Sequence, residues 1–196
     1  MVDEPDEKAA DEELMQHVAL GSRQAFEILI ARHQRPILNF IFRFIGNRSD
    51  AEDLTQDVFL RVWENAGTYL PEARFTTWLY RIATNLCINL QRRNRIRRWF
   101  SASEKNRKEQ QSDNAPMAGR DTTGPTPEDD YIQFEQSRHV RGMLNELPTS
   151  QRLAVILKVY EELSYSEISR ILGRSPAAVD SLLIRAKRNL RKKINA

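Results

Sequence analysis

Apolar residues recur at helical spacing along most of this chain, and one long polar segment divides them into two groups. No stretch shows the sustained alternation of apolar and polar residues that is typical of a half-buried strand. The segment Ser101–Pro127 is rich in Ser, Asn, Gln, Gly, Pro and Asp and poor in large apolar groups. Such a segment cannot bury enough surface to offset its chain entropy. The pattern therefore predicts an all-α protein with two small helical domains joined by a flexible linker.

This division gives four expected segments along the chain. Residues 1–10 form an acidic flexible tail, 11–100 a first helical domain, 101–127 the linker and 128–196 a second helical domain. Hydrophobic residues make up 40% of the 196 residues, which is enough to build a core but not a large one.

Capping residues and helix breakers set the expected helices at the start of the first domain. Asp11 is expected to cap a short helix that ends near Gly21, and Ser22 to cap the next one. Pro36 is expected to break or kink this second helical stretch, and Gly46, followed by Asn, to stop it.

Three further elements are expected in the rest of the first domain. Ser49 and Glu52 fit a capping box that opens a helix through Trp63. Residues 64–74 contain glycine and proline and are expected to form a loop. A long helix then follows over residues 75–98.

Residues 163–190 have the pattern of two short helices joined by a tight turn. Ser164 and Glu167 form a second capping box, Gly173 permits a left-handed turn, and Ser175 caps the next helix. Two helices joined in this way form a helix-turn-helix, whose second helix enters the major groove of DNA. An ordinary helical hairpin is the alternative, but the strongly basic second helix favours DNA binding.

The second helix of this motif presents a polar face away from its apolar stripe. Arg185 is suited to the edge of a guanine, and Asp180 to the amine of a cytosine. Lys187 and Arg188 are better placed for phosphates, where they add affinity without sequence information. The full set of candidate duplex-binding residues is Asp180, Ser181, Ile184, Arg185, Lys187 and Arg188.

The first domain carries an acidic face on the helix that precedes the loop. Asp53, Gln56 and Asp57 lie at positions i, i+3 and i+4, so they share one exposed side of that helix. Such a face can simply be solvated. Because an acidic face is ill suited to DNA, a protein partner is the natural functional alternative.

The long helix combines aromatic and basic residues. Arg81, Asn85 and Arg92 recur on a face that differs from its buried stripe, and Arg92 begins a run of positive charge that includes Arg93. Aromatic rings beside cations suit single-stranded DNA, where bases stack and phosphates pair. Trp78 and Tyr80 are candidates for stacking, although a core role is favoured for Trp78.

Several kinds of chemistry have no support in the sequence. The histidines His17, His33 and His139 lack the spacing of a metal site, and no phosphate-binding glycine loop is present. Cys87 is the single cysteine, so it forms no internal disulfide, and a reducing cytosol is the expected compartment. Cys87 itself is expected to be a small packing residue. The longest apolar stretch, residues 36–45, is too short to span a bilayer. We expect no catalytic residue, no metal, no cofactor and no membrane insertion.

Two motifs of the first domain resemble the extracytoplasmic-function (ECF) group of sigma factors in the sigma-70 family. The chain reads D-x-E-D-L-x-Q-x-x-F from Asp50 and F-x-x-W-L-x-x-I-A-x-N from Phe75. The resemblance covers about residues 11–98 and 131–193. It implies a promoter-melting domain first and a domain for the −35 element second. Asn89 and Asp180 depart from the family, which often has Asp and a basic residue at these two positions.

The resemblance also implies partners and roles for the candidate residues. Asp53, Gln56 and Asp57 would contact the β′ clamp of core RNA polymerase, and the loop over residues 65–73 would hold a flipped base. The −10 strand would face Arg81, Asn85, Arg92 and Arg93, and the −35 element would face Asp180, Ser181, Ile184, Arg185, Lys187 and Arg188. Other expected partners are the polymerase β subunit, promoter DNA and an anti-sigma factor, in the cytoplasm.

Two other classes of protein remain as alternatives. A helix-turn-helix regulator that never touches polymerase needs neither the acidic face nor the aromatic-basic helix. A DNA recombinase would need a catalytic domain around a Ser or Tyr nucleophile, and the first domain offers no arginine cluster around either.

Overall fold

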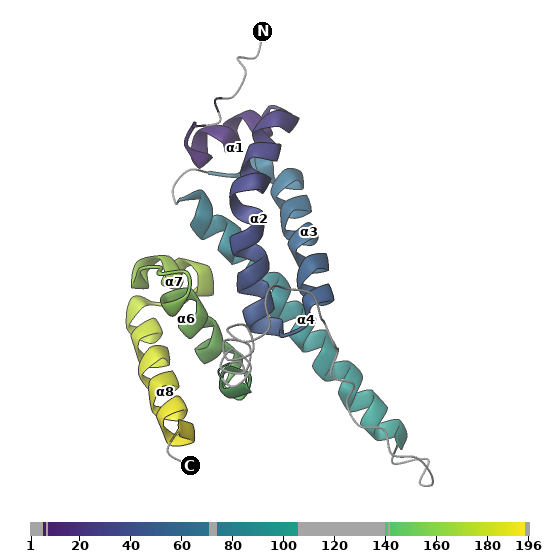
Figure 1. The fold of residues 1–196 in the computed structure, drawn as a ribbon, viewed down its shortest axis with the longest axis vertical. Helices are drawn as coiled ribbons and strands as arrows, with labels where there is room; N and C mark the ends of the chain where they lie inside the picture. The colour runs from purple at the N-terminus through teal and green to yellow at the C-terminus, as the bar shows by residue number, and fades with distance from the viewer. Residues whose placement is uncertain (1–5, 7, 71–73, 106–139, 141, 195–196) are drawn as a thin grey trace, which may run out of the picture.

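The computed structural model describes residues 6, 8–70, 74–105, 140 and 142–194. All regular elements in these ranges are helices, which confirms the all-α fold class for them (Figure 1). The longer helices are α1 (Asp11–Ala19), α2 (Arg23–Ile45), α3 (Arg48–Glu64), α4 (Phe75–Lys105), α6 (Thr149–Val159), α7 (Tyr165–Leu172) and α8 (Pro176–Ile194). A short 3-10 turn, η1 (Ala66–Thr68), precedes α4. Residues 106–127 of the predicted linker lie outside the described residues.

The first domain is a bundle in which α2 contacts α1, α3 and α4. Its largest fully buried side chains include Leu29, Phe40, Phe44, Phe75 and Leu79, so aromatic rings fill much of the core. The last turns of α4 project beyond the bundle (Figure 1). This helix ends at Lys105 rather than at the predicted residue 98, so residues 101–105 are helical and not linker.

Two of the predicted helix boundaries around α2 are confirmed. The Ser22 side chain caps the helix by accepting a hydrogen bond from the Ala25 amide. Gly46 ends the helix with a left-handed backbone, at φ +81°, a conformation that costs glycine little because it lacks a Cβ atom. The predicted cap at Asp11 is wrong: Ala10 occupies the cap position, and Asp11 instead pairs with side chains of α2.

Two other predictions for the first domain are corrected by the structure. Pro36 was expected to break or kink the helix, and the break does not occur: α2 continues through it as one 23-residue helix packed against four neighbours. Pro36 is exposed, and this packing outweighs the loss of one hydrogen bond. The capping box at Ser49 and Glu52 is also wrong, because the Asn47 side chain already accepts from the Asp50 amide.

The second domain contains the predicted helix-turn-helix, formed by α7 and α8. The capping box of Ser164 and Glu167 is complete, and Gly173 has a left-handed backbone at φ +61°. The Ser175 hydroxyl accepts from the Ala178 amide at 3.2 Å, as expected for the cap of α8. The preceding helix, α6, ends at Val159.

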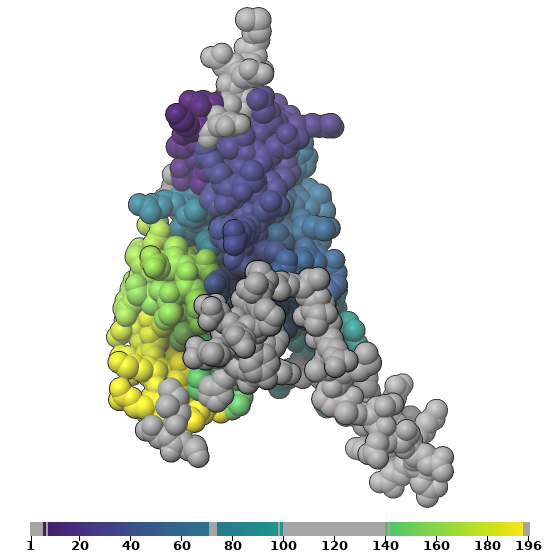
Figure 2. All heavy atoms as spheres, in the orientation of Figure 1, coloured from purple at the N-terminus to yellow at the C-terminus, as the bar shows by residue number. Residues whose placement is uncertain are grey.

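The two domains pack directly against each other, with α7 on α4 and α6 on α2. Figure 2 shows the second domain, in green and yellow, lying along the side of the first. One hydrophobic cluster runs through both and includes Ile156 and Ile168 from the second domain. Polar contacts also cross the boundary: Arg152 Nη1 donates to the Phe44 carbonyl at 3.0 Å, and Tyr80 donates to Glu161.

Candidate DNA-binding and polymerase-binding surfaces

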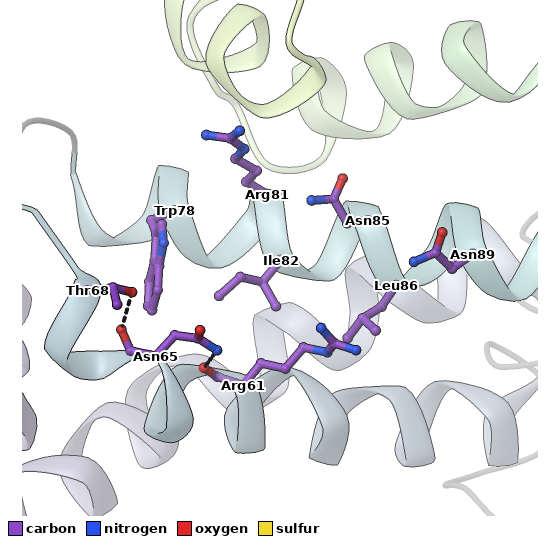
Figure 3. Close-up of a pocket in the computed structure, with 9 residues that line it drawn as sticks. All are labelled: Arg61, Asn65, Thr68, Trp78, Arg81, Ile82, Asn85, Leu86 and Asn89. Carbon is purple, nitrogen blue, oxygen red and sulfur yellow. Dashed lines mark hydrogen bonds between the residues drawn. The ribbon is translucent and has the colours of Figure 1, made fainter.

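A pocket of about 270 Å³ opens between α3, η1 and α4 in the first domain. We call it the α4 pocket, because most of its residues come from that helix (Figure 3). Its lining consists of Arg61, Asn65, Thr68, Trp78, Arg81, Ile82, Asn85, Leu86 and Asn89. Two guanidinium groups, three amides, a hydroxyl and an indole therefore converge on one cavity.

The turn at the end of α3 forms one end of the α4 pocket. The Asn65 side chain donates through Nδ2 to the Arg61 carbonyl at 2.8 Å, and the Thr68 hydroxyl donates to the Asn65 carbonyl at 2.8 Å. These bonds hold the turn beside the ring of Trp78 (Figure 3). The pocket thus has an aromatic wall next to polar groups that are fixed by the backbone.

Exposed polar residues, spaced four apart along α4, line another side of the α4 pocket. Arg81, Asn85 and Asn89 are all exposed, while Ile82 and Leu86 lie lower and contribute to its apolar floor. Figure 3 shows the Arg81 side chain directed toward the second domain. An amide side chain both donates and accepts hydrogen bonds, so it suits the pairing edge of a nucleobase.

Arg61 is the pocket residue that the sequence interpretation missed. It belongs to α3, the helix expected to contact protein, and its side chain extends along the α4 pocket below Leu86 (Figure 3). Helical spacing gave no indication of this role, because Arg61 lies four residues beyond Asp57 and so continues the side of α3 that was expected to contact protein. Arg92 and Arg93, by contrast, are exposed further along α4 and do not line the pocket.

The two aromatic candidates for base stacking differ in position. Trp78 is only partly buried, lines the α4 pocket and also packs on the first domain's core, so it is available to both roles. Tyr80 is 7% exposed, and its hydroxyl donates to Glu161 of the second domain. Burial, with the nearby Glu161 carboxylate, raises the pKa of Tyr80. The expectation that Tyr80 stacks on a base is therefore wrong for this arrangement, in which the two domains are in contact.

The acidic face lies on the solvent side of α3. Asp53, Gln56 and Asp57 are all exposed, as their spacing predicted. Leu60, one turn further along, is also 54% exposed, so the face ends in an apolar group. A mixed charged and apolar helix surface of this kind suits a protein partner.

The candidate residues of α8 form a separate exposed surface. Asp180, Arg185, Lys187 and Arg188 are exposed, and Ile184 has 61% of its surface accessible. Ser181 is half-buried. Because Val179 and Ala186 are buried on the opposite side, the helix presents its basic face outward, as a recognition helix must.

Other kinds of site receive no support from the described part of the chain. No group of three or more metal-ligating side chains gathers within it, and none of its helices is long and apolar enough to cross a membrane. Cys87 is fully buried, and burial raises the pKa of its thiol to about 12. The thiolate that redox chemistry requires is therefore scarce at neutral pH.

Two family models match separate parts of this chain: Sigma-70 region 2 at residues 29–97 and Sigma-70 region 4 at residues 137–190. The RNA polymerase sigma factor YlaC of Bacillus subtilis (strain 168) is 32% identical over 170 residues, which cover 87% of this chain and 92% of that protein. The ECF RNA polymerase sigma factor SigW of the same strain is 29% identical over 181 residues, covering 92% and 94%.

Solved structures show the same fold. The structure of CnrH in complex with the cytosolic domain of CnrY matches with a TM-score of 0.70 and 24% identity, over 95% of this chain and 98% of that one. The motifs, the relatives and the two matched regions define a sigma factor of the sigma-70 type. The chain belongs to the ECF group of that family and directs transcription initiation as an alternative sigma factor.

Proposed function

We propose that this sigma factor divides its work among the three surfaces described above. The acidic face of α3 binds the β′ clamp of core RNA polymerase, the α4 pocket selects a base of the −10 strand, and α8 reads the −35 element. The observation that carries this assignment is the α4 pocket, where charged, amide and aromatic groups meet beside a basic helix.

The α4 pocket has the chemistry needed to hold one unpaired base. Trp78 offers a surface for stacking, and the amides of Asn65 and Asn85 are suited to the edge of the base. Arg61 and Arg81 supply positive charge for the neighbouring phosphates. Arg92 and Arg93 extend this charge along α4, where they contact the backbone of the same strand.

The exposed face of α8 reads duplex DNA. Arg185 is its main base contact, with Asp180, Ser181 and Ile184 beside it, while Lys187 and Arg188 neutralise phosphates. These roles require no contact with the first domain. The helix-turn-helix therefore supplies sequence preference independently of the α4 pocket.

The direct packing of the two domains has a consequence for promoter binding. Elements centred near −10 and −35 are about 25 base pairs apart, which is roughly 85 Å along the DNA axis. We call the arrangement in which α4 and α7 are in contact the closed form. In the closed form, the two domains cannot bind the −10 and −35 elements of a straight promoter at the same time. The α4–α7 interface must open when the chain binds polymerase and DNA, and the segment between the domains has to span the gap.

We also propose an anti-sigma partner and a cytoplasmic location. The CnrH structure is a complex with the cytosolic domain of CnrY, and the sigma factor RpoE of Bartonella quintana, with a TM-score of 0.61 and 20% identity, was solved with the anti-sigma factor NepR. A protein that binds across both domains of the closed form would prevent their separation. The chain itself is not an enzyme, because catalysis of RNA synthesis belongs to the polymerase.

Run-off transcription with purified core polymerase tests this function. Core polymerase should start RNA at specific promoters only when the chain is added, and pull-down should recover a complex of the two. A helix-turn-helix regulator acting without polymerase would bind duplex DNA yet leave core polymerase unable to select a start site. That outcome would favour the alternative function over the proposed one.

A further inference from the structure

The amino end of α4 is capped by a side chain from a different helix. The backbone amide of Phe75, the first residue of α4, donates to Glu12 Oε1 of α1 at 2.8 Å. The first turn of α4 contains no acidic residue of its own. A carboxylate at this position satisfies an otherwise open amide and interacts favourably with the helix dipole. Glu12 therefore performs for α4 the role that a local cap performs elsewhere.

Glu12 is held in place because α1 is fixed to α2. The neighbouring Asp11 accepts a hydrogen bond from Arg32 Nη1 through Oδ1 at 2.8 Å, and its Oδ2 lies 2.8 Å from His33 Nε2. On the other side of α1, Leu14 and Met15 are fully buried. Polar and apolar contacts thus fix the short helix from two sides.

A cluster of three aromatic rings connects this cap to the α4 pocket. The ring of Phe75 lies 6.3 Å from that of Tyr69 and 6.2 Å from that of Trp78, and Tyr69 and Trp78 are 5.1 Å apart. Trp78 is the aromatic wall of the pocket. Burial, followed by the nearby Glu12 and Asp11 carboxylates, raises the pKa of Tyr69 to about 12.

Helix α1 also supports the turn that lies beside Trp78. It packs against η1, the turn that carries Thr68 into the lining. The start of α4 and the turn at the end of α3 therefore rest on the same short helix. Helix α1 therefore contacts both of the elements that meet at Trp78.

We propose that Glu12 is a positioning residue for base selection: it contacts no DNA, but it sets the spacing between the Trp78 wall and the Asn65–Thr68 turn. This inference rests on the proposed role of the α4 pocket in holding a −10 base. It assigns a function in promoter recognition to a helix that lies outside the residues matched by the region 2 model, which begin at residue 29.

The test compares Glu12→Ala and Glu12→Gln with the unmodified chain. A pool of single-stranded oligonucleotides of random sequence is captured on each full-length protein and sequenced before and after capture. The preferred base at the selected position should be enriched about fivefold less by Glu12→Ala, which is part of the discrimination that one good base contact supplies. Glu12→Gln should restore most of the preference, because its amide oxygen still accepts from the Phe75 amide.

Glu13→Ala is the matched control, since Glu13 is the adjacent, exposed carboxylate on the same helix. It should leave the enrichment unchanged. Circular dichroism at the assay temperature should show that each variant is folded, so that a loss of stability is not read as a loss of base preference. Full base preference in Glu12→Ala, or an equal loss in Glu13→Ala, would overturn the positioning role. No preference in the unmodified chain would instead remove the proposed role of the pocket.

Discussion

The two domains of this sigma factor differ in how far each supplies its own core. The first domain buries a large set of side chains from four helices, including three phenylalanines that are almost fully inaccessible. The second domain has a separate small cluster of Leu144, Leu147 and Ala186, while six of its other buried apolar residues belong to the cluster it shares with the first domain. The second domain is therefore completed partly by its neighbour.

The two surfaces that we propose to read DNA also differ in how much each depends on neighbouring elements. The α4 pocket is concave and depends on α3, η1 and α4 together, so its geometry is a property of the whole first domain. The reading surface of α8 is one exposed helix face whose side chains need only the helix beneath them. The comparison indicates that changes in the domain interface affect the stability of the second domain more than its sequence preference.

Substitution of Arg152 is expected to have the largest effect on the stability of the second domain relative to the first. Its guanidinium is buried, donates across the interface to the Phe44 carbonyl at 3.0 Å and also donates to Asn145. Arg152→Ala removes a charged donor from the buried Phe44 carbonyl and from the acceptors of Asn145, and should destabilise the second domain by roughly 3 kcal/mol. All three tryptophans lie in the first domain, so their fluorescence should change little while circular dichroism reports early loss of helix.

Arg170→Ala is the control for this measurement, because Arg170 is an exposed arginine of the same domain. It should shift neither probe measurably. If the tryptophan fluorescence and the helical signal of Arg152→Ala changed in the same transition, the first domain would depend on the second as strongly as the second depends on the first.

The second largest effect is expected at the acidic face of α3, which we propose to bind protein and not DNA. Charge reversal at Asp53 and Asp57 should weaken binding to core polymerase by about 2 kcal/mol, because like charges would face each other across the contact. Both residues are exposed, so the helical content should remain. Reversing Glu13 and Glu27, which are exposed acids on other helices, changes the net charge equally and serves as the control. Unchanged recovery of polymerase in a pull-down would remove the clamp assignment.

Features set by neighbouring residues were predictable from the sequence. The helix-turn-helix follows from Ser164, Gly173 and Ser175, each of which acts on backbone within four residues of itself. Ser22 and Gly46 set the ends of α2 in the same way. The exposed acidic and basic faces were predictable as well, because helical spacing alone decides which residues share a side.

Features set by distant residues were not predictable. The contact between Tyr80 and Glu161 joins residues 81 positions apart, so nothing near Tyr80 indicates that it is buried. Glu12 likewise caps a helix that begins 63 residues later. Pro36 was expected to break or kink α2 from its own chemistry, but α2 packs against four other helices and continues through it. Such errors arise where tertiary contacts override a local preference.

Arg185 and Lys187 should distinguish base contacts from phosphate contacts in the second domain. Arg185→Ala should weaken binding to a preferred duplex by about 1.5 kcal/mol and relax preference at one position, whereas Lys187→Ala should weaken all sequences alike. Binding of a duplex library followed by sequencing distinguishes the two, with the unmodified chain as reference. An even loss across all sequences in Arg185→Ala would make Arg185 a phosphate contact. The single-stranded preference of the α4 pocket should be the same in both variants.

The smallest expected effect concerns the acid–base behaviour of the domain interface at Glu161. This carboxylate accepts a hydrogen bond from Tyr80 and lies 3.3 Å from Arg43 Nη1, and only 8% of its side chain is exposed. Burial raises the pKa of Glu161 above its ordinary value of 4.5, although Tyr80 and Arg43 oppose the shift. Glu167, another acid at the interface, lies 3.8 Å from Arg74 of the first domain, and its pKa is lowered mainly by its hydrogen bonds with Ser164 in its own capping box.

Because the pKa of Glu161 is higher in the closed form than in the open form, the closed form binds the proton more tightly. Lowering the pH toward 4.5 should therefore favour closure, and raising the pH through the window above 4.5 should weaken it, by less than about 1 kcal/mol. Energy transfer between one dye on each domain measures this slope. Glu161→Gln should flatten it while retaining an acceptor for Tyr80, and Glu162→Gln, at the exposed adjacent residue, should preserve it. If domain closure in Glu161→Gln still depended on pH to the same extent, another group would be responsible for the titration.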